Sequence, residues 1–236
     1  MSTNTIPAEL YIDAARVFHW ATKRHFQLWF TGEEKTRHTR TEIVLKRLTR
    51  RGKIRAVRFG KKLVYALPRK SKRFSEIGGL SKVAHGLECT ECLVRFFRSG
   101  SDGEVIAERY FYGLGAVPEW GIRYSNGTLL LCEFCTKSNF YFSGNIKGKV
   151  AAYRNSLEKI EEKFQTKAVV VFVCDVARSA VKREVGSLAG ARAGGDGFPF
   201  DPFFFTDYET FKNVTFGEQL TAPIYFWMDG KEYPLK

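Results

Sequence analysis

The sequence predicts an α+β protein made of a small helical module that ends in a β-hairpin and a larger α/β domain around a mixed sheet. Helical periodicity followed by two short β-prone runs fills the first 67 residues, and the excess positive charge is confined to about the same stretch. Further along, apolar strand-like runs alternate with amphipathic helices, as in α/β domains. We therefore expect a first domain over residues 1–67, a basic linker over 68–78 and a second domain over 79–236.

Charge is distributed very unevenly along the 236 residues. Residues 1–73 contain 19 Lys and Arg against 5 Asp and Glu, a net charge of +14, whereas residues 74–236 contain 19 basic and 20 acidic groups, a net charge of −1. Such segregation favours a polyanionic partner, because every Lys or Arg placed on a phosphate releases counterions. Nucleic acid is the first choice. An anionic membrane surface is the alternative, but it usually requires a basic amphipathic helix with a broad apolar face.

The first module contains three expected helices. Apolar residues recur at helical spacing over Tyr11–Thr22, and a second short apolar segment covers His25–Phe30. A third helix is expected from Thr39 through Arg51, because Thr39 and Glu42 form a capping signature and Gly52 is the residue type that commonly follows a helix end.

A hairpin after the third helix completes the DNA-binding prediction. Two β-prone runs, Ile54–Phe59 and Leu63–Leu67, are joined by Gly60-Lys61-Lys62, which is typical of a hairpin with a basic tip. Three helices followed by such a hairpin form the pattern of a winged helix-turn-helix, whose third helix enters the major groove of double-stranded DNA. RNA is an alternative, but it would favour stacking aromatics on a sheet, and this segment has none so arranged. The basic residues expected to contact DNA are Arg37, Arg40, Lys46, Arg47, Arg50, Arg51, Lys61 and Lys62.

Helix and strand patterns alternate through the second module. A long helix over Leu80–Arg98 and a short one over Glu104–Tyr112 precede a hairpin whose turn is Asn126-Gly127, the strongest short hairpin signal in the chain. Nearly continuous apolar runs predict strands that are buried on both faces of a sheet. The further expected elements are strands Trp120–Tyr124, Thr128–Phe134, Ala168–Cys174, Phe203–Thr206 and Ile224–Trp227, helices Ile146–Phe164 and Val176–Leu188, and a turn at Asp229-Gly230.

Acidic residues on the expected hairpin predict a metal centre. Glu119 begins one strand and Glu133 lies near the end of its partner, and a third carboxylate from Glu104 or Glu108 could complete an oxygen site for Mg²⁺. Such an ion would orient a water for attack on a phosphodiester, and a nearby lysine would stabilise the developing negative charge. The expected metal ligands are therefore Glu108, Glu119 and Glu133.

The order helix, acid, hairpin, acid, helix, strand resembles the core of the PD-(D/E)xK nuclease superfamily. More narrowly, most of the chain resembles the plasmid replication-relaxation proteins, in its winged-helix-like start and in the segments SKVAHGLECTECLVRF, EVIAERYF, VPEW, LLLCEFCT, KGKVAAY, FFFTDYETF and APIYFW. The resemblance implies a second domain of the restriction-endonuclease-like type, with Glu119 and Glu133 at its two acidic positions. The chain departs from the pattern at Glu119, where Asp is usual, and at Cys135, where Lys or a second acid is usual. Lys137 or Lys149 would then supply the positive charge.

Three functions are compatible with these observations. The first is a double-stranded DNA-binding protein of a plasmid or other mobile element, acting in replication, relaxation or mobilisation, with a degenerate nuclease-like domain. The second is a Mg²⁺-dependent DNA endonuclease whose catalytic residues are Glu119, Glu133 and Lys149. The third is a transcriptional repressor whose second domain dimerises or senses. A homodimer is expected, because winged helices that read palindromes usually act in pairs.

The cysteines and the apolar runs bear on the compartment. Five thiols with no secretory signal predict reduced cysteines in the cytoplasm. No apolar run approaches the roughly 20 residues that span a bilayer, so no membrane is expected as a partner.

Cys89-x-x-Cys92 and Cys132-x-x-Cys135, with His85, superficially match a paired zinc pattern, but the second pair falls in an expected strand, where residues three apart face opposite sides. We expect these thiols to belong to the core.

Overall fold

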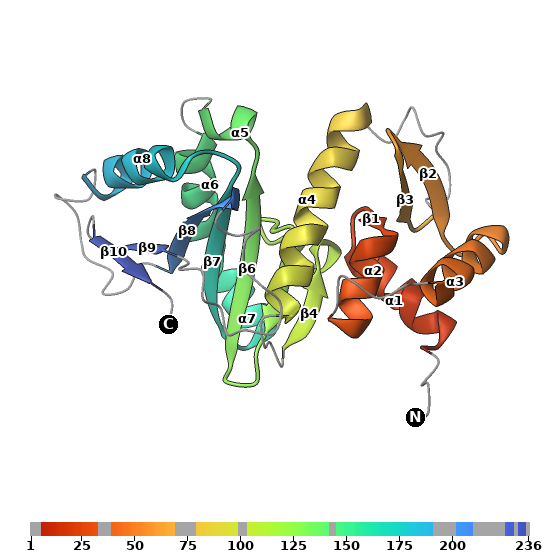
Figure 1. Cartoon of the computed structure of the whole chain (residues 1–236). Coiled ribbons are helices and arrows are strands. Elements are labelled where there is room, and N and C mark those ends of the chain that lie inside the picture. The colour runs from red at the N-terminus through yellow and green to blue at the C-terminus, as the bar shows by residue number, and fades with distance from the viewer. Residues whose placement is uncertain are drawn as a thin grey trace. The chain divides into compact units, whose positions relative to one another are not determined.

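The computed structural model divides the chain into two compact units, Met1–Gly100 (unit 1) and Ser101–Lys236 (unit 2) (Figure 1). The division falls after the long helix α4 (Gly79–Arg98), which packs on α2 and β1 of unit 1, whereas the sequence analysis assigned this helix to the second domain. The residues that the structure describes are 6–32, 39–68, 79–98, 103–141, 145–190, 202–209, 225–228 and 231–234.

Unit 1 combines helices with a small antiparallel sheet. Its strands pair in the order β1-β3-β2, and Gly60 closes the β2–β3 hairpin with a φ of 57°, a conformation that glycine adopts without strain. The three helices and the hairpin that the sequence predicts are present. The elements are α1 (Ala8–Val17), β1 (Ala21–Thr22), α2 (Lys23–Thr31), α3 (Thr39–Arg50), β2 (Arg55–Phe59), β3 (Lys62–Ala66) and α4 (Gly79–Arg98).

The first helix is shorter than the sequence predicts. It ends at Val17 because Phe18 takes up an extended backbone, whereas the periodicity had predicted a helix to Thr22. Residues 21 and 22 form β1 and pair with β3, far along the chain. This long-range pairing overrides the local helical preference.

A glycine lets α4 approach the rest of unit 1 closely. A Cβ built on Gly86 would lie 2.8 Å from Cδ1 of Trp20 and 3.0 Å from Cβ of His19. Trp20 in turn packs with Val64 and Val83 in a small buried cluster. A larger residue at position 86 would therefore push the helix away from this cluster or displace the tryptophan.

Unit 2 is built on a five-stranded mixed sheet with the strand order β4-β5-β6-β7-β8, which confirms the expected mixed sheet. Strands β4, β5 and β6 pair antiparallel, and β6, β7 and β8 pair parallel. The strands are β4 (Glu104–Ala107), β5 (Trp120–Arg123), β6 (Thr128–Cys135), β7 (Lys167–Cys174) and β8 (Phe203–Asp207), with a separate hairpin of β9 (Tyr225–Met228) and β10 (Lys231–Pro234). The helices are the 3₁₀ helix η2 (Glu108–Phe111), α5 (Lys137–Tyr141), α6 (Asn145–Arg154), α7 (Leu157–Phe164) and α8 (Arg178–Gly190). The expected turn at Asp229-Gly230 lies outside the described residues.

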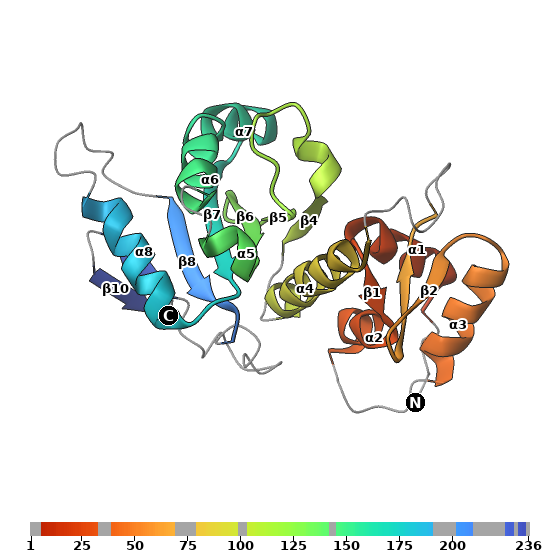
Figure 2. The same cartoon turned by 90° about the horizontal axis from the view of Figure 1, so that it is seen from above.

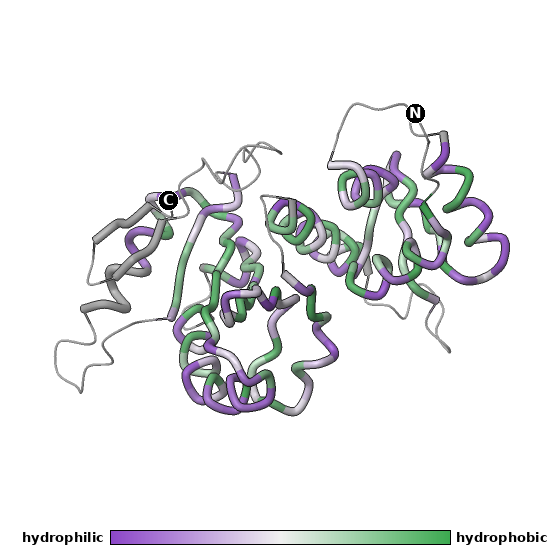
Figure 3. The backbone as a smooth tube through the Cα atoms, turned by 90° about the horizontal axis from the view of Figure 1, so that it is seen from below, coloured by the Kyte–Doolittle hydropathy of each residue, from purple (hydrophilic) through white to green (hydrophobic). Residues whose placement is uncertain are grey.

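The main core of unit 2 lies against one face of this sheet, where α6 and α7 cover the strands (Figure 2). Hydrophobic residues run through the central strands, as their apolar sequences predict (Figure 3). The register places Glu133 of β6 beside Phe172 of β7, which lies beside Phe205 of β8. Since both phenylalanines belong to the core, Glu133 is a charged residue in an apolar row.

The segment that was expected to form a short helix over Glu104–Tyr112 begins instead as a strand. Residues 104–107 form β4 at the edge of the sheet, and only η2 is helical. Ile106 is buried and pairs with Gly121 of β5. The apolar contact with the sheet decides the conformation of a segment whose local pattern fits either element.

The helix that was expected over Ile146–Phe164 is two helices, α6 and α7, separated at Asn155 and Ser156. The Ser156 hydroxyl donates a hydrogen bond of 2.6 Å to the carbonyl of Ala152, a backbone contact that often bends helices. Gly115 approaches the same serine so closely that a Cβ there would lie 2.4 Å from its Oγ. None of the helices in the described part of the chain is long and apolar enough to cross a membrane.

Candidate functional site

Helix α3 carries its buried and its basic residues on opposite faces. Thr41, Leu45 and Leu48 are buried within unit 1. The exposed residues of α3 and of the position that follows it are Arg40, Ile43, Lys46, Arg47, Arg50 and Arg51. Within the described ranges, none of the four arginines in this set makes an ion pair. The face is therefore a set of cations whose charge is available to a polyanion.

The one lysine on this face is partly neutralised. Nζ of Lys46 lies 2.8 Å from Oε1 of Glu42, and Nζ of Lys23 lies 3.1 Å from Oε2. The hydrogen bonds from Lys46 and Lys23 hold the pKa of Glu42 below its ordinary value. We expect Lys46 to contribute less to binding an anion than Arg47, which has no such partner among the described residues.

The hairpin of unit 1 supplies a second basic element. Lys61 lies in the turn and Lys62 begins β3 directly after it, and both are exposed at the tip of the predicted hairpin. Gly60, with its positive φ, allows the two-residue turn that brings Phe59 opposite Lys62. Arg37, the remaining predicted DNA contact, lies outside the described residues.

A buried carboxylate is the main feature of unit 2. Glu133 is only 5% exposed, and both of its oxygens accept hydrogen bonds. Oε1 accepts from the Lys149 ammonium of α6, and Oε2 accepts at 2.8 Å from the hydroxyl of Tyr153, one turn further along the same helix. The sequence therefore identified two members of this group correctly as neighbours, Glu133 and Lys149. Lys137, the alternative cation, is exposed at the start of α5.

The protonation of this group is set by opposing effects. Burial raises the pKa of Glu133, the Lys149 ammonium lowers it, and the Glu119 carboxylate raises it; the pKa ends above its ordinary value. Burial alone would lower the pKa of Lys149, but the Glu133 carboxylate outweighs burial and raises it. Burial and the same carboxylate raise the pKa of Tyr153 well above its ordinary value, so the phenol stays a hydrogen-bond donor. The arrangement favours the protonated form of a buried carboxyl more than water does and places a cation beside it.

The other two predicted acids flank the adjoining strands, Glu119 directly before β5 and Glu108 directly after β4. The backbone N–H of Glu119 donates to the carbonyl of Cys132 at 2.9 Å, which fixes Glu119 at the start of β5. Its charge reaches Glu133, as the pKa of Glu133 shows. Glu108 is the first residue of η2, directly after the β4 residue that pairs with Trp120. Strand pairing thus brings Glu119 to Glu133.

Tyr153 is the member of this group that sequence reasoning missed. It falls on the apolar face of α6, where it packs edge-on against Phe172 with ring centroids 5.9 Å apart. Its spacing of four residues from Lys149 is the signal that could have found it, because positions i and i+4 share a helix face.

Unit 1 contains a second buried carboxylate that the sequence did not reveal. Oε2 of Glu91 lies 2.6 Å from a guanidinium nitrogen of Arg24 and 3.0 Å from Nε2 of His25, and Oε1 lies 2.6 Å from the guanidinium of Arg95. The backbone N–H of Thr22 donates to Nδ1 of His25 at 3.2 Å, so Nε2 carries the hydrogen that it donates to Glu91. Burial would raise the pKa of Glu91, but the hydrogen bonds from His25 and Arg24 outweigh it and hold the pKa far below its ordinary value. This cluster joins α2 to α4.

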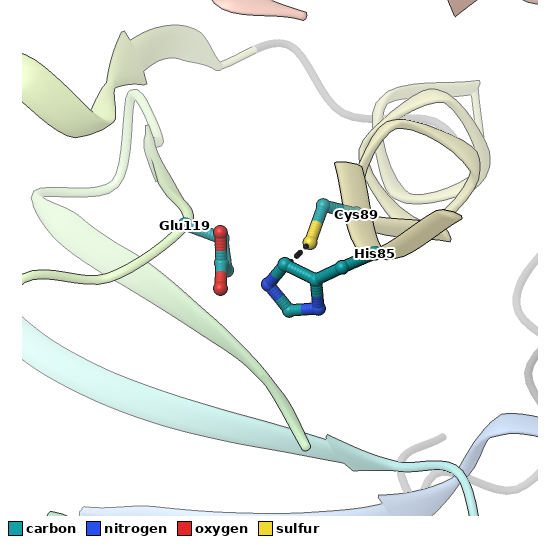
Figure 4. A group of neighbouring side chains, drawn as sticks. All are labelled: His85, Cys89 and Glu119. Atoms are coloured by element: carbon teal, nitrogen blue, oxygen red, sulfur yellow. Dashed lines mark hydrogen bonds between the residues drawn. The ribbon is translucent and has the colours of Figure 1, made fainter. Parts of the chain in front are cut away.

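The cysteines lie where the sequence analysis placed them, on a helix and on strands. Cys89 and Cys92 are buried on α4, and Sγ of Cys89 lies 3.5 Å from Nε2 of His85 one turn earlier (Figure 4). Cys132 and Cys135 are buried on β6. No disulfide joins any of the five cysteines, all of which are among the described residues.

No protein-family model matches the chain, and no curated protein and no solved structure matches it either.

Proposed function

We propose that the chain is a double-stranded DNA-binding protein of a plasmid or other mobile element and that unit 1 binds the duplex. The observation that carries the proposal is the exposed face of α3, where Arg40, Arg47 and Arg50 have no ion-pair partner within the described ranges. Arginines in this state can each take a phosphate and release its counterion. The exposed Lys61 and Lys62 of the hairpin extend the same charge to a second element.

The order of elements in unit 1 supports the same proposal. Helix, short strand, two helices and a two-stranded hairpin follow one another as in winged helix-turn-helix domains. In such domains the third helix lies in the major groove, and the exposed basic residues of this chain are on its third helix. The resemblance to replication-relaxation proteins adds plasmid DNA as the expected substrate.

Fluorescence anisotropy with a labelled random-sequence duplex tests the proposal. Arg47→Ala should weaken binding and reduce the slope of log affinity against log salt by about 1, because one phosphate contact is lost. Arg16→Ala is the matched control: Arg16 is an exposed arginine of α1 that pairs with Asp13 at 2.5 Å, and its loss should leave the slope unchanged. Equal slopes for wild type and Arg47→Ala would contradict the placement of DNA on α3.

The proposal includes a homodimer, because a palindromic target is matched by two copies related by a two-fold axis. Sedimentation of the chain with and without a duplex measures the stoichiometry. One chain per duplex at saturation would contradict the dimer and leave the placement of DNA on α3 intact.

A second candidate function, metal-dependent DNA cleavage, is favoured by the grouping of Glu133, Lys149 and Glu119 in unit 2. Mg²⁺ takes carboxylate oxygens as ligands, and a cation between Glu119 and Glu133 would relieve the repulsion that raises the pKa of Glu133. These two residues would hold the ion, which would supply a polarised water and neutralise the leaving phosphate. Lys149 would stabilise negative charge on the phosphate, and Tyr153 would keep Glu133 in place.

Incubation of supercoiled plasmid with Mg²⁺ or Mn²⁺ separates the two functions. A nuclease requires nicking that is lost in Glu133→Ala and in Lys149→Met but retained in Glu158→Ala, which removes an exposed glutamate of α7. Intact plasmid with every metal, together with tight binding in the anisotropy titration, would eliminate cleavage and leave a binding protein or a transcriptional repressor.

A further inference from the structure

The exposed face of α3 has an apolar residue at its centre. Ile43 is 58% exposed, and it lies about half a helical turn away from the buried Leu45 and Thr41. Its neighbours at spacings of three and four residues are Arg40, Lys46 and Arg47, all of them exposed. Ile43 therefore lies on the exposed face of α3 with three cationic side chains as its neighbours.

Neither helix formation nor packing within unit 1 explains this isoleucine. A β-branched residue is a weaker helix former than alanine or the long polar residues that usually occupy exposed positions. Leu45 and Leu48, which are buried, supply the contacts of α3 with the core. An apolar side chain is thus available on the outer face of α3 to whatever this face meets.

The surrounding charge restricts what that partner can be. An apolar protein surface would have to cover three or more cations without neutralising them, which is unfavourable. Duplex DNA offers phosphates for the cations and, within the major groove, one apolar group that a side chain can reach: the C5-methyl of thymine. Ile43 also lies in the N-terminal half of α3, the part of a third helix whose residues contact base edges.

We propose that Ile43 is a specificity-determining residue that contacts the C5-methyl group of a thymine in the target duplex. This inference rests on the proposed function, since it requires α3 to lie in the major groove. The arginines on either side give affinity that does not depend on sequence, and Ile43 makes one position of the site prefer thymine.

The test uses the full chain and a pool of duplexes with a randomised centre. Wild-type protein selects its preferred duplex from the pool, and each thymine of that duplex is then replaced in turn by uracil, which lacks only the methyl group. At one thymine we expect wild type to bind the uracil duplex about fourfold more weakly, the size of one methyl group withdrawn from water. Ile43→Ala should bind the two duplexes equally, and Ile43→Val should retain most of the difference.

Leu10→Ala is the matched control. Leu10 is an exposed apolar residue of α1, 46% exposed, and its loss should leave the thymine preference unchanged. Three results would overturn the role of Ile43 and leave DNA binding standing. Wild type could bind the thymine and uracil duplexes equally, Ile43→Ala could retain the effect of uracil, or the protein could bind the pool without enriching any sequence. Absence of binding to the whole pool at low salt would overturn the proposed function itself, and the inference with it.

Discussion

Each unit of this protein buries one glutamate among cationic and hydrogen-bonding neighbours, and the two carboxylates are shifted in opposite directions. Glu91 in unit 1 is contacted by Arg24, His25 and Arg95, and its pKa is far below the ordinary value. Glu133 in unit 2 is contacted by one ammonium and one phenol, and its pKa is raised. Burial acts in the same sense on both, so the neighbours decide the outcome.

Glu91 has the surroundings of a carboxylate in a structural ion pair, whereas Glu133 has surroundings of the kind found in catalytic and binding sites. Three donors fix Glu91 in its charged form, and its Oε2 ties α4 to Arg24 and His25 of α2. Glu133 has a like charge, Glu119, near it and a single cation, Lys149, so its charged and neutral forms lie closer in free energy. Groups balanced in this way occur often in catalytic and binding sites, and structural ion pairs resemble Glu91.

The largest effect is expected from Glu91→Ala. Removal of the carboxylate takes away the ion pair that it makes with the buried Arg95 guanidinium and with the partly exposed Arg24, and breaking a buried ion pair in this way typically lowers the free energy of unfolding by about 3–5 kcal/mol. Hydrogen exchange of the amides in α2 and α4 during urea titration measures unit 1 separately from unit 2. Asp13→Ala, which breaks the exposed pair with Arg16 on α1 of the same unit, is the control and should change stability by less than about 1 kcal/mol. Equal effects of the two substitutions would show that the Glu91 carboxylate stabilises unit 1 no more than an exposed ion pair does.

The pH dependence of stability should have opposite signs in the two units. The lowered pKa of Glu91 means that its contribution is present above its ordinary value of 4.5 and is lost as the pH falls below it. Of the stability difference between wild type and Glu91→Gln, we expect about 2 kcal/mol to disappear between about pH 6 and about pH 3. The raised pKa of Glu133 acts in reverse: relative to Glu133→Gln, wild type should be most stable below 4.5 and lose that advantage as the pH rises through the raised pKa. Parallel pH profiles for the two pairs would contradict the opposite shifts.

The smallest effect is expected from Tyr153→Phe. The substitution keeps the ring packed on Phe172 and removes the hydrogen bond to Oε2 of Glu133, which should lower stability by about 1.5 kcal/mol. It should also raise the pKa of Glu133 further, as carboxyl-carbon NMR would measure. Tyr110→Phe, at an exposed tyrosine of η2, provides the comparison and should leave that pKa where it is. A Glu133 resonance that titrates identically in both variants would show that the phenol does not stabilise the carboxylate.

Sequence reasoning succeeded where one residue type or one continuous run sets the structure. The apolar runs of β6 and β7, the Asn126-Gly127 turn and the basic face of α3 follow from local composition. Lys149, which the resemblance offered with Lys137 as the cation near Glu133, does donate a hydrogen bond to this carboxylate.

It failed where contacts between distant segments decide. The segment at β4 has a pattern that fits a helix or a strand, and its pairing with β5 settles the choice. The expected continuous helix is broken after Arg154, next to Ser156, which bonds to the carbonyl of Ala152 and lies against the distant Gly115. The Glu91 cluster draws its members from α2 and α4, more than sixty positions apart in the chain, so no local pattern could reveal it.

The close approach at Gly86 has a mechanical consequence. With Trp20 against the glycine and Glu91 clamped by α2, the last helix of unit 1 is fastened at two successive turns to the body that carries α3. Since α4 is the last element of unit 1, the chain leaves this unit from a helix that is held at both points. A side chain at position 86 would therefore loosen α4 from the rest of unit 1 without touching either the arginines of α3 or Glu133.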